Sequence, residues 1–283
     1  MSDTTTSTRS VTVAQRPLLL SWAGVTDVGR RRETNQDAFF AEYPLFIVAD
    51  GMGGHAGGEI ASRSTVTRLQ AVATSGSVGR ASIEGALELA VADIADHPEA
   101  TDEGTGTTLT GVFLEFDEEE PHWAALNIGD SRVYLLRDDR LIQVTTDHSV
   151  VQELIAAGKI SPEEAEGHPY SNVITRAVGA SELTAPDYVT IDVRAGDRFV
   201  ICSDGLTKEL TDYGIQHFLR ANADPAAAVD AMLAAALENG GRDNVTLVVV
   251  QVSDESSSTD SSSSDAATAA VDDVSSTEDR QSD

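Results

Sequence analysis

Aspartates stand at the ends of several apolar, strand-like segments of the chain. Such segments run directly into Asp50, end one residue before Asp204 and, less regularly, end shortly before Asp130, and a glycine adjoins each of the three. Buried strands that end in a carboxylate and a tight turn can direct several anions at one point. Anions that lie so close together repel strongly unless a cation lies between them. The pattern therefore predicts a site for divalent metal ions.

The alternative for each of these aspartates is an ordinary turn, because a single Asp-Gly pair is most often a hairpin connection. Recurrence favours the metal site, since Asp37 and Asp243 also flank predicted strands. Carboxylate, carbonyl and water oxygens suit Mg²⁺ or Mn²⁺. Zinc would call for histidines and cysteines at ligand spacing, and the six histidines and single cysteine have none. The EF-hand loop pattern does not occur.

A nucleotide-binding loop is the other interpretation of the glycines that follow Asp50. The dinucleotide fingerprint would need glycine at position 56, where the chain has Ala56, and no Walker lysine follows. The glycines are better explained as positions where backbone carbonyls can approach a metal ion.

The net charge of −28 over 283 residues excludes nucleic acid and anionic membranes as main partners. The tail alone does not account for it, because residues 253–283 carry a net −8 and leave −20 on the rest. With only two lysines, the chain has the composition that a salt-rich cytoplasm favours, so we expect a halophilic, cytoplasmic protein. We see no signal peptide and no membrane-spanning segment. Cys202 is expected to be a buried core residue.

Strand-like segments fill the middle of the chain, and helical patterns come before and after them. Apolar spacing predicts helices around residues 60–69, 83–94, 149–155 and 224–237. Ser149 and Gln152 suit a capping box, and Asp224 with Pro225 suits a helix start. Strands are expected near residues 18–25, 37–41, 45–50, 107–116, 122–128, 132–137, 140–145, 188–194, 197–203 and 244–252.

Short turns between successive strands imply antiparallel pairing, and one-faced helices must cover the sheets, so the simplest fold is a β-sandwich with helices outside. Residues 146–187 lack strand character and are predicted to form a helical flap. Residues 1–16 are predicted to be a flexible arm. Residues 253–283 hold almost no large apolar side chains, so they are predicted to be a disordered acidic Ser/Thr-rich tail. One domain remains over residues 17–252.

Seven short motifs occur in a fixed order along this domain. They are Arg32-x-x-Asn35-Gln36-Asp37, Asp50-Gly51-Met52-Gly53-Gly54-His55, Gly106-Thr107-Thr108, Gly129-Asp130-Ser131-Arg132, Asp147-His148-Ser149, Ser203-Asp204-Gly205-Leu206 and Gly241-Arg242-Asp243-Asn244. In this order they resemble the type-2C metal-dependent protein serine/threonine phosphatases, in their prokaryotic form. The resemblance covers residues 32–244. It implies an α+β fold, a four-layer α-β-β-α sandwich with two antiparallel sheets covered by helices.

The resemblance also implies two Mn²⁺ or Mg²⁺ ions, and possible roles for the residues around them. Asp50 would bridge the two ions, the Gly51 carbonyl would bind one of them, and Asp204 with Asp243 would bind the other. Asp37 would act mainly through metal-bound water. Asp130, together with Asp204, matches the place of a third, weaker ion.

Three further residues would act on the substrate or the bound water. Arg32 matches the arginine that binds phosphate, for which a bidentate guanidinium is suited, and Asn244 would orient the water shell. The family often has glutamate where Gln36 stands. Many eukaryotic members have a proposed general acid, histidine, where Met52 stands. The leaving group's proton would come from His55 or from a metal-bound water, and the sequence leaves both open.

The function expected is hydrolysis of phosphoserine and phosphothreonine in proteins by metal-activated water, which reverses Ser/Thr kinase signalling. Partners would be phosphorylated proteins, including Ser/Thr kinases and their substrates, and the protein is expected to be a monomer. Two alternatives stay open: a phosphatase of small phosphoesters, and an inactive module that binds phosphoproteins. Asp50, Asp204 and Asp243 argue against the second, because a binder has no need of three converging carboxylates.

Overall fold

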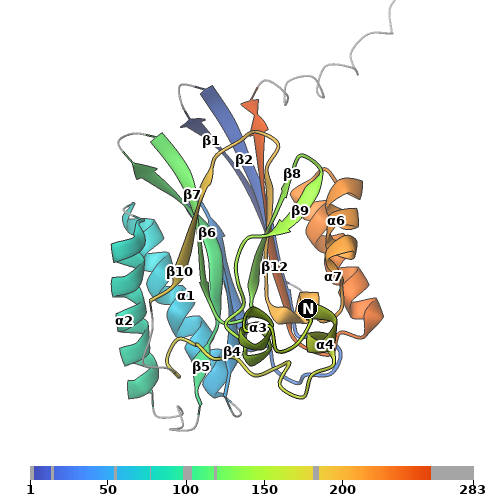
Figure 1. Cartoon of the computed structure of the whole chain (residues 1–283). Helices are drawn as coiled ribbons and strands as arrows, with labels where there is room; N and C mark the ends of the chain where they lie inside the picture. The colour runs from blue at the N-terminus through green and yellow to red at the C-terminus, as the bar shows by residue number, and fades with distance from the viewer. Residues whose placement is uncertain are drawn as a thin grey trace, which may run out of the picture.

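Two antiparallel sheets face each other at the centre of the molecule (Figure 1). The structure is a computed structural model, which describes residues 3–13, 16–53, 56–76, 78–97, 104–117, 120–180 and 185–255. The first sheet has the order β1 (Asp3–Val13), β2 (Arg16–Asp27), β12 (Val245–Asp254), β11 (Arg198–Cys202), β8 (Arg132–Arg137) and β9 (Arg140–Gln143). The second has the order β10 (Asp187–Asp192), β7 (Glu120–Ile128), β6 (Leu109–Asp117), β4 (Leu45–Met52) and β3 (Asp37–Glu42), and the short β5 (Gly106–Thr107) also pairs with β4.

An aromatic-rich core fills the space between the sheets. The rings of Trp22 and Phe46 meet edge to face with centroids 5.2 Å apart, and those of Trp123 and Phe199 lie 5.3 Å apart. All four side chains are buried in one apolar cluster to which strands of both sheets contribute. Aromatic pairs of this geometry stabilise a fold beyond the apolar area they bury.

Helices cover the outer faces and complete four layers. On the second sheet lie α1 (Gly57–Ser75) and α2 (Arg80–Asp96), and on the first lie α6 (Asp212–Ala221) and α7 (Pro225–Asn239). The sequence explains the start of α7, because Asp224 accepts a hydrogen bond from the amide of Ala227 at 3.1 Å and Pro225 follows it. The expected α-β-β-α sandwich is confirmed.

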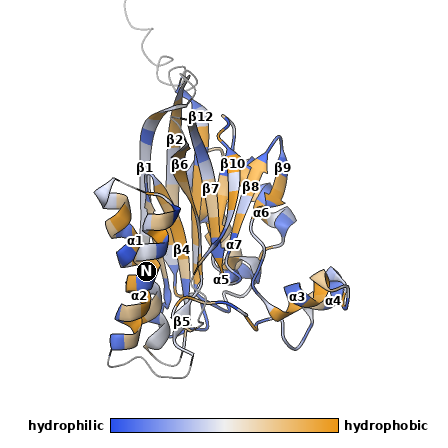
Figure 2. Ribbon diagram, turned by 60° about the vertical axis from the view of Figure 1, so that its left-hand side comes forward, coloured by the Kyte–Doolittle hydropathy of each residue, from blue (hydrophilic) through white to orange (hydrophobic). Residues whose placement is uncertain are grey.

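The helices of the flap lie apart from the sandwich, although Val178, near the end of the flap, is buried in the core and pairs with Thr107 of β5. The two short helices of the flap are α3 (Val150–Ala156), which Ser149 caps, and α4 (Pro162–Glu166). Figure 2 shows both of them set away from the sheets. The side chain of Arg176 binds Asp187 at 2.8 Å, which ties the flap to β10.

The N-terminal arm is where the structure departs from the sequence prediction. Residues 3–13 form β1, which pairs with β2 from Asp3 opposite Thr26 to Val13 opposite Arg16. The segment is polar, but its threonines suit a strand with one solvated face, and Val11 packs against the core. The predicted flexible arm is wrong for these residues.

The other end of the chain gives a smaller correction. Ser253 and Asp254, assigned to the tail, belong to β12, and residues 256–283 lie outside the described part. Cys202 is buried as expected. Among the described residues, no helix is long and apolar enough to cross a membrane.

Candidate metal centre

The aspartate-bearing strand ends meet at one end of the sandwich. Asp37 lies opposite Asp50 in the pairing of β3 with β4. In the other sheet β11 and β12 are antiparallel neighbours, so Asp204, which follows β11, comes close to Asp243, which precedes β12. Asp130 follows β7 at the same end. The sequence placed these side chains on five separate segments, and the fold brings them together.

Hydrogen bonds from two threonines hold the backbone of Asp50. The Asp50 amide donates to Thr108 Oγ1 at 3.0 Å, and the Asp50 carbonyl accepts from Thr107 Oγ1 and from the Thr108 amide, both at 2.9 Å. At Gly51 a Cβ atom would come within 2.1 Å of the Gly58 carbonyl oxygen. Only glycine fits this close approach of two backbones. The backbone of Asp50 is therefore held on both sides, by the threonines and by the packing of Gly51 against Gly58.

Asp37 is a buried carboxyl with an incomplete set of partners. Ser203 Oγ donates to Asp37 Oδ2 at 2.8 Å, and Ser203 Oγ in turn accepts from the Thr246 amide at 3.1 Å. Asp37 Oδ1 has no hydrogen-bond partner. Burial raises the pKa of Asp37 to about 7 despite the hydrogen bonds from Thr246 and Ser203, and the charges of Asp204 and Asp243 act in the same direction as burial.

Asp50 and Asp130 experience the same unfavourable surroundings. Burial raises the pKa of Asp50 well above its usual range, and the negative charges of Asp37, Asp204 and Asp130 reinforce the shift. Burial likewise raises the pKa of Asp130 to about 7, with help from Asp204 and Asp147. Several carboxylates therefore act on one another at this end of the molecule, which is the electrostatic situation that a bound cation relieves.

The loop that carries Asp130 is fastened to the flap through a histidine. The Gly129 amide donates to His148 Nδ1 at 3.1 Å, and the His148 amide donates to the Gly129 carbonyl at 2.9 Å. The other ring nitrogen, Nε2, lies 3.1 Å from both Asp187 Oδ2 and Arg176 Nη1. The two hydrogen bonds between Gly129 and His148 join the flap to the loop that carries Asp130.

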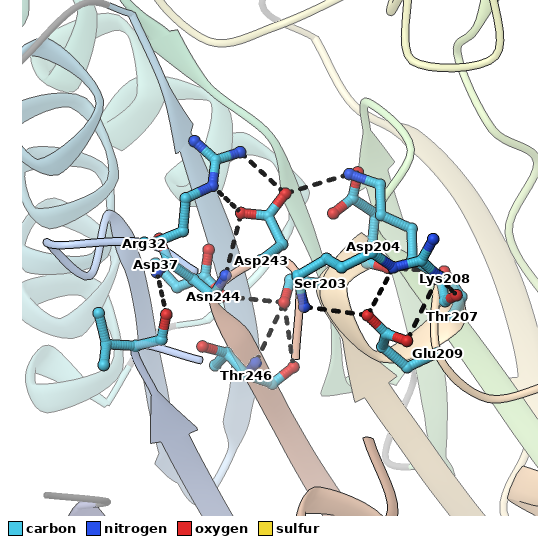
Figure 3. Close-up of polar contacts among 12 residues, drawn as sticks. Arg32, Asp37, Ser203, Asp204, Thr207, Lys208, Glu209, Asp243, Asn244 and Thr246 are labelled. Carbon is cyan, nitrogen blue, oxygen red and sulfur yellow. Dashed lines mark hydrogen bonds and ion pairs between the residues drawn. The ribbon is translucent and has the colours of Figure 1, made fainter. Parts of the chain in front are cut away.

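Two cations surround the carboxylate of Asp243 (Figure 3). Arg32 Nε lies 2.8 Å from Asp243 Oδ1 and Arg32 Nη2 lies 3.0 Å from Oδ2, a bidentate pair. Lys208 Nζ lies 3.2 Å from Asp243 Oδ2 and 2.5 Å from Asp204 Oδ2. Burial by itself raises the pKa of Asp243, but Lys208 and Arg32 outweigh it and the pKa is lowered.

Asn244 makes backbone contacts that its motif did not predict. Its Nδ2 donates to the carbonyls of Val28 and Thr34, both at 2.9 Å, and its Oδ1 accepts from the Gln36 amide at 2.9 Å. Both amide protons therefore bind backbone, and the side chain fastens the loop that carries Arg32 beside Asp243. The side chain therefore positions this loop, and its role in orienting water stays a prediction.

The donor set fits hard divalent ions. Asp37 Oδ1 and Asp204 Oδ1 are buried and have no hydrogen-bond partner, although buried polar atoms nearly always have one. Among the described residues, however, no three His, Cys, Asp or Glu side chains already form a closed set of metal ligands. Lys208 and Arg32 bind oxygens of Asp204 and Asp243 that an ion would use. An ion would have to draw these carboxylates inward.

His55 lies outside the described residues, as does Gly54, so its predicted role stays a prediction. Sequence reasoning missed three contributors: Ser203, Thr108 and Lys208. Lys208 had a usable signal, because it follows Asp204 by four residues, a spacing that puts both side chains on one face of a helix. Ser203 and Thr108 bind residues distant in sequence, and only the fold reveals them.

Comparison with known proteins places the chain in a family. Residues 28–240 match the family model described as Protein phosphatase 2C. The Serine/threonine protein phosphatase PstP of Mycobacterium tuberculosis is 38% identical over 246 residues, which cover 86% of this chain and 47% of PstP, so the chain spans about half the length of that relative. Protein phosphatase PhpP of Streptococcus pneumoniae is 35% identical over 242 residues, covering 81% of this chain and 96% of PhpP.

A solved structure agrees with this placement. The catalytic domain of PstP in complex with two manganese ions is 36% identical and superposes with a TM-score of 0.74, covering 84% of this chain and 100% of that one. The sequence match, the shared sandwich and the acidic end of its sheets agree with one another. The chain belongs to the protein phosphatase 2C family.

Proposed function

We propose that the protein hydrolyses phosphoserine and phosphothreonine in other proteins and uses two Mn²⁺ or Mg²⁺ ions to do so. The observation that carries this proposal is the meeting of aspartates at one end of the sheets, where Asp37 lies opposite Asp50 and one oxygen each of Asp37 and Asp204 is buried without a hydrogen-bond partner. Burial and the charges of neighbouring aspartates raise the pKa values of Asp37, Asp50 and Asp130. A structural cluster would be expected to contain its own counter-charges. Uncompensated carboxylates within a family of metal-dependent phosphatases support a metal-dependent reaction.

The roles proposed for the ligands are those that the resemblance to the phosphatase family implies. Asp50, held by its backbone on β4, would bridge the two ions, and the Gly51 carbonyl would bind one of them. Asp204 and Asp243 would bind the other, and Asp37 would act through water. Asp130 would help Asp204 to hold a third ion. Two such ions supply a water nucleophile of lowered pKa and neutralise charge on the phosphoryl group.

The protein side chains contribute binding and orientation. Arg32 is half-exposed, with 53% of its side chain accessible, so its guanidinium can reach a substrate phosphate as well as Asp243. Its planar fork suits two phosphoryl oxygens at once. Ser203 holds Asp37 in place, and Asn244 holds the loop that carries Arg32. His55 remains a candidate for the group that protonates the leaving alkoxide, beside a metal-bound water.

We further propose that the enzyme opposes Ser/Thr kinases as a monomer in a salt-rich cytoplasm. The support is the net charge of −28 together with a content of only two lysines. Such a surface repels itself at low ionic strength, and about 1 M salt shortens the screening length to roughly 3 Å. The preferred phosphoproteins would then be recognised by contacts near the acidic end of the sheets rather than by long-range charge attraction.

The test is an assay of the full chain after exhaustive dialysis against a chelator, with and without added Mn²⁺, in about 1 M salt. A phosphothreonine peptide and a nucleoside monophosphate serve as parallel substrates. We expect Mn²⁺-dependent release of phosphate from the peptide, and loss of that activity in Asp204→Asn. Equal or faster hydrolysis of the nucleotide would favour the small-phosphoester alternative. Binding of the phosphopeptide without hydrolysis would favour the inactive module.

A further inference from the structure

The ammonium of Lys208 lies between two of the carboxylates proposed to bind metal. Its Nζ is 2.5 Å from Asp204 Oδ2 and 3.2 Å from Asp243 Oδ2, and Figure 3 draws it on the opposite side of Asp243 from Arg32. Lys208 immediately follows α5 (Asp204–Thr207), the single turn of helix that begins with Asp204. Its side chain is one-third exposed, so water only partly screens these contacts.

The oxygens that Lys208 binds are the ones an incoming ion would need. Asp243 Oδ2 accepts from both Lys208 and Arg32, and Asp243 Oδ1 accepts from Arg32 and from the Asn244 amide at 3.0 Å. Asp204 has one oxygen on Lys208 and the other without a partner. Mn²⁺ and Mg²⁺ are oxygen-seeking ions, and Mg²⁺ binds oxygen at about 2.0–2.1 Å, so an ammonium cannot remain between the same two carboxylates.

The Asp50 side of the centre is different. Among the residues that the structure describes, no lysine, arginine or histidine forms an ion pair with Asp37 or Asp50. An ion can bind on that side without displacing a cationic side chain of the described residues. The two sides should therefore differ in metal affinity.

We propose that Lys208 is a resident counter-ion, which neutralises Asp204 and Asp243 in the metal-free protein and is displaced when the ion they bind arrives. The proposal rests on the proposed function, because it assumes that these two aspartates bind metal. Its consequence is ordered loading: the ion on the Asp50 side binds first, and the ion between Asp204 and Asp243 binds more weakly. A simple exposed i,i+4 pair would have neither effect, since such pairs contribute little.

The experiment is calorimetric titration of Mn²⁺ into the chelator-stripped full chain, for the wild type, Lys208→Met and Lys208→Arg. Lys159→Met is the matched control, because Lys159 is the other lysine and is exposed beside α3. We expect two binding steps in the wild type. Lys208→Met should tighten the weaker step by about 10- to 100-fold, the range that charge-assisted hydrogen bonds represent. Lys208→Arg and Lys159→Met should stay within about threefold of the wild type.

Thermal unfolding provides the second readout. It separates displacement of Lys208 from the carboxylates by the ion from simple repulsion between Lys208 and a nearby ion. The melting temperature of metal-free Lys208→Met should fall below that of the wild type, whereas the Mn²⁺-saturated proteins should melt together. If metal-free Lys208→Met does not fold, Lys208→Gln is titrated in its place, and the loaded Met variant is titrated with a competing chelator.

Two outcomes overturn different claims. Wild-type protein that binds Mn²⁺ while Lys208→Met binds it no more tightly would refute the role of Lys208 alone. Wild-type protein that binds no Mn²⁺ would refute the proposed function itself.

Discussion

The two halves of the acidic centre differ in how the negative charge of their aspartates is balanced. On one side lie Asp37 of β3, which is buried, and Asp50 of β4, which is partly buried; both have raised pKa values and no ion pair among the described residues. On the other side Asp243 shares its oxygens with Arg32 and Lys208, and its pKa is lowered. In the first half, a bound metal ion would have to supply the positive charge that balances the carboxylates. In the second half, Arg32 and Lys208 supply positive charge in the metal-free protein.

The largest effect is expected from Asp50→Asn, which removes the charge at the centre of the uncompensated half. Mn²⁺-dependent hydrolysis of a phosphothreonine peptide should fall by about 10³-fold or more, the scale at which electrostatic stabilisation of transition states acts. The metal-free variant should nevertheless melt at a higher temperature than the wild type at neutral pH, because folding no longer has to raise the pKa of a desolvated and repelled carboxyl.

Asp230→Asn is the matched control, since Asp230 is exposed on α7. It should change neither activity nor melting temperature. Asp50→Asn that keeps more than about a tenth of wild-type activity would remove Asp50 from the reaction.

The pH dependence of the metal-free protein should have opposite signs for the two halves. Asp37 and Asp130, with pKa values of about 7, hold protons in the folded state that the unfolded chain releases. Stability therefore falls as pH rises from about 4 to about 7, by up to ~1.4 kcal/mol per pH unit for the buried Asp37. Asp243 has a lowered pKa, so its contribution is present above its ordinary pKa and is lost as pH falls below it.

Urea unfolding of chelator-stripped protein between about pH 4.5 and 7.5 measures the first of these slopes. Asp37→Asn should flatten it. Saturating Mn²⁺ should reverse it, because metal binding expels the protons. A free energy of unfolding that does not change with pH in the metal-free wild type would mean that folding does not raise the pKa of these carboxyls.

The smallest effect is expected from Ser203→Ala. It removes the hydroxyl that donates to Asp37 Oδ2 at 2.8 Å and leaves the Thr246 amide without its partner at 3.1 Å. Unfolding free energy should fall by about 1–2 kcal/mol, and Mn²⁺ should bind several-fold more weakly. Ser253→Ala, at the far end of β12, should cost less than about 0.5 kcal/mol. Equal losses at the two serines would contradict a special role for Ser203.

Most of the fold could be predicted because local patterns and burial agree along the chain. Residues 45–50 and 197–203 are short apolar runs that end at an aspartate or just before one, and both became central strands, β4 and β11. Asp224 and Pro225 marked the start of α7 correctly. The exception was residues 3–13, whose polar composition suggests an unstructured arm. Residues 3–13 form a strand because they pair with β2, and their own sequence does not predict this pairing.

The aspartates of the site could be predicted and their supports could not. Asp50, Asp204 and Asp243 stand in local motifs, so a single segment identifies each. Ser203 and Asp37 are 166 residues apart, and no local pattern indicates that they share a hydrogen bond. The motif of Asn244 gives no sign of its contacts with Val28 and Thr34, because these depend on how the first loop packs against β12.

Crystals soaked in Mn²⁺ and measured at the manganese absorption edge would test the central claim most directly. We predict two strong anomalous peaks at the acidic end of the sheets, both bound by the carboxylate of Asp50, with Asp204 and Asp243 on only one of them and Lys208 moved away from Asp204. Manganese peaks that do not contact Asp50, or no ordered manganese at that end of the sandwich, would contradict the account.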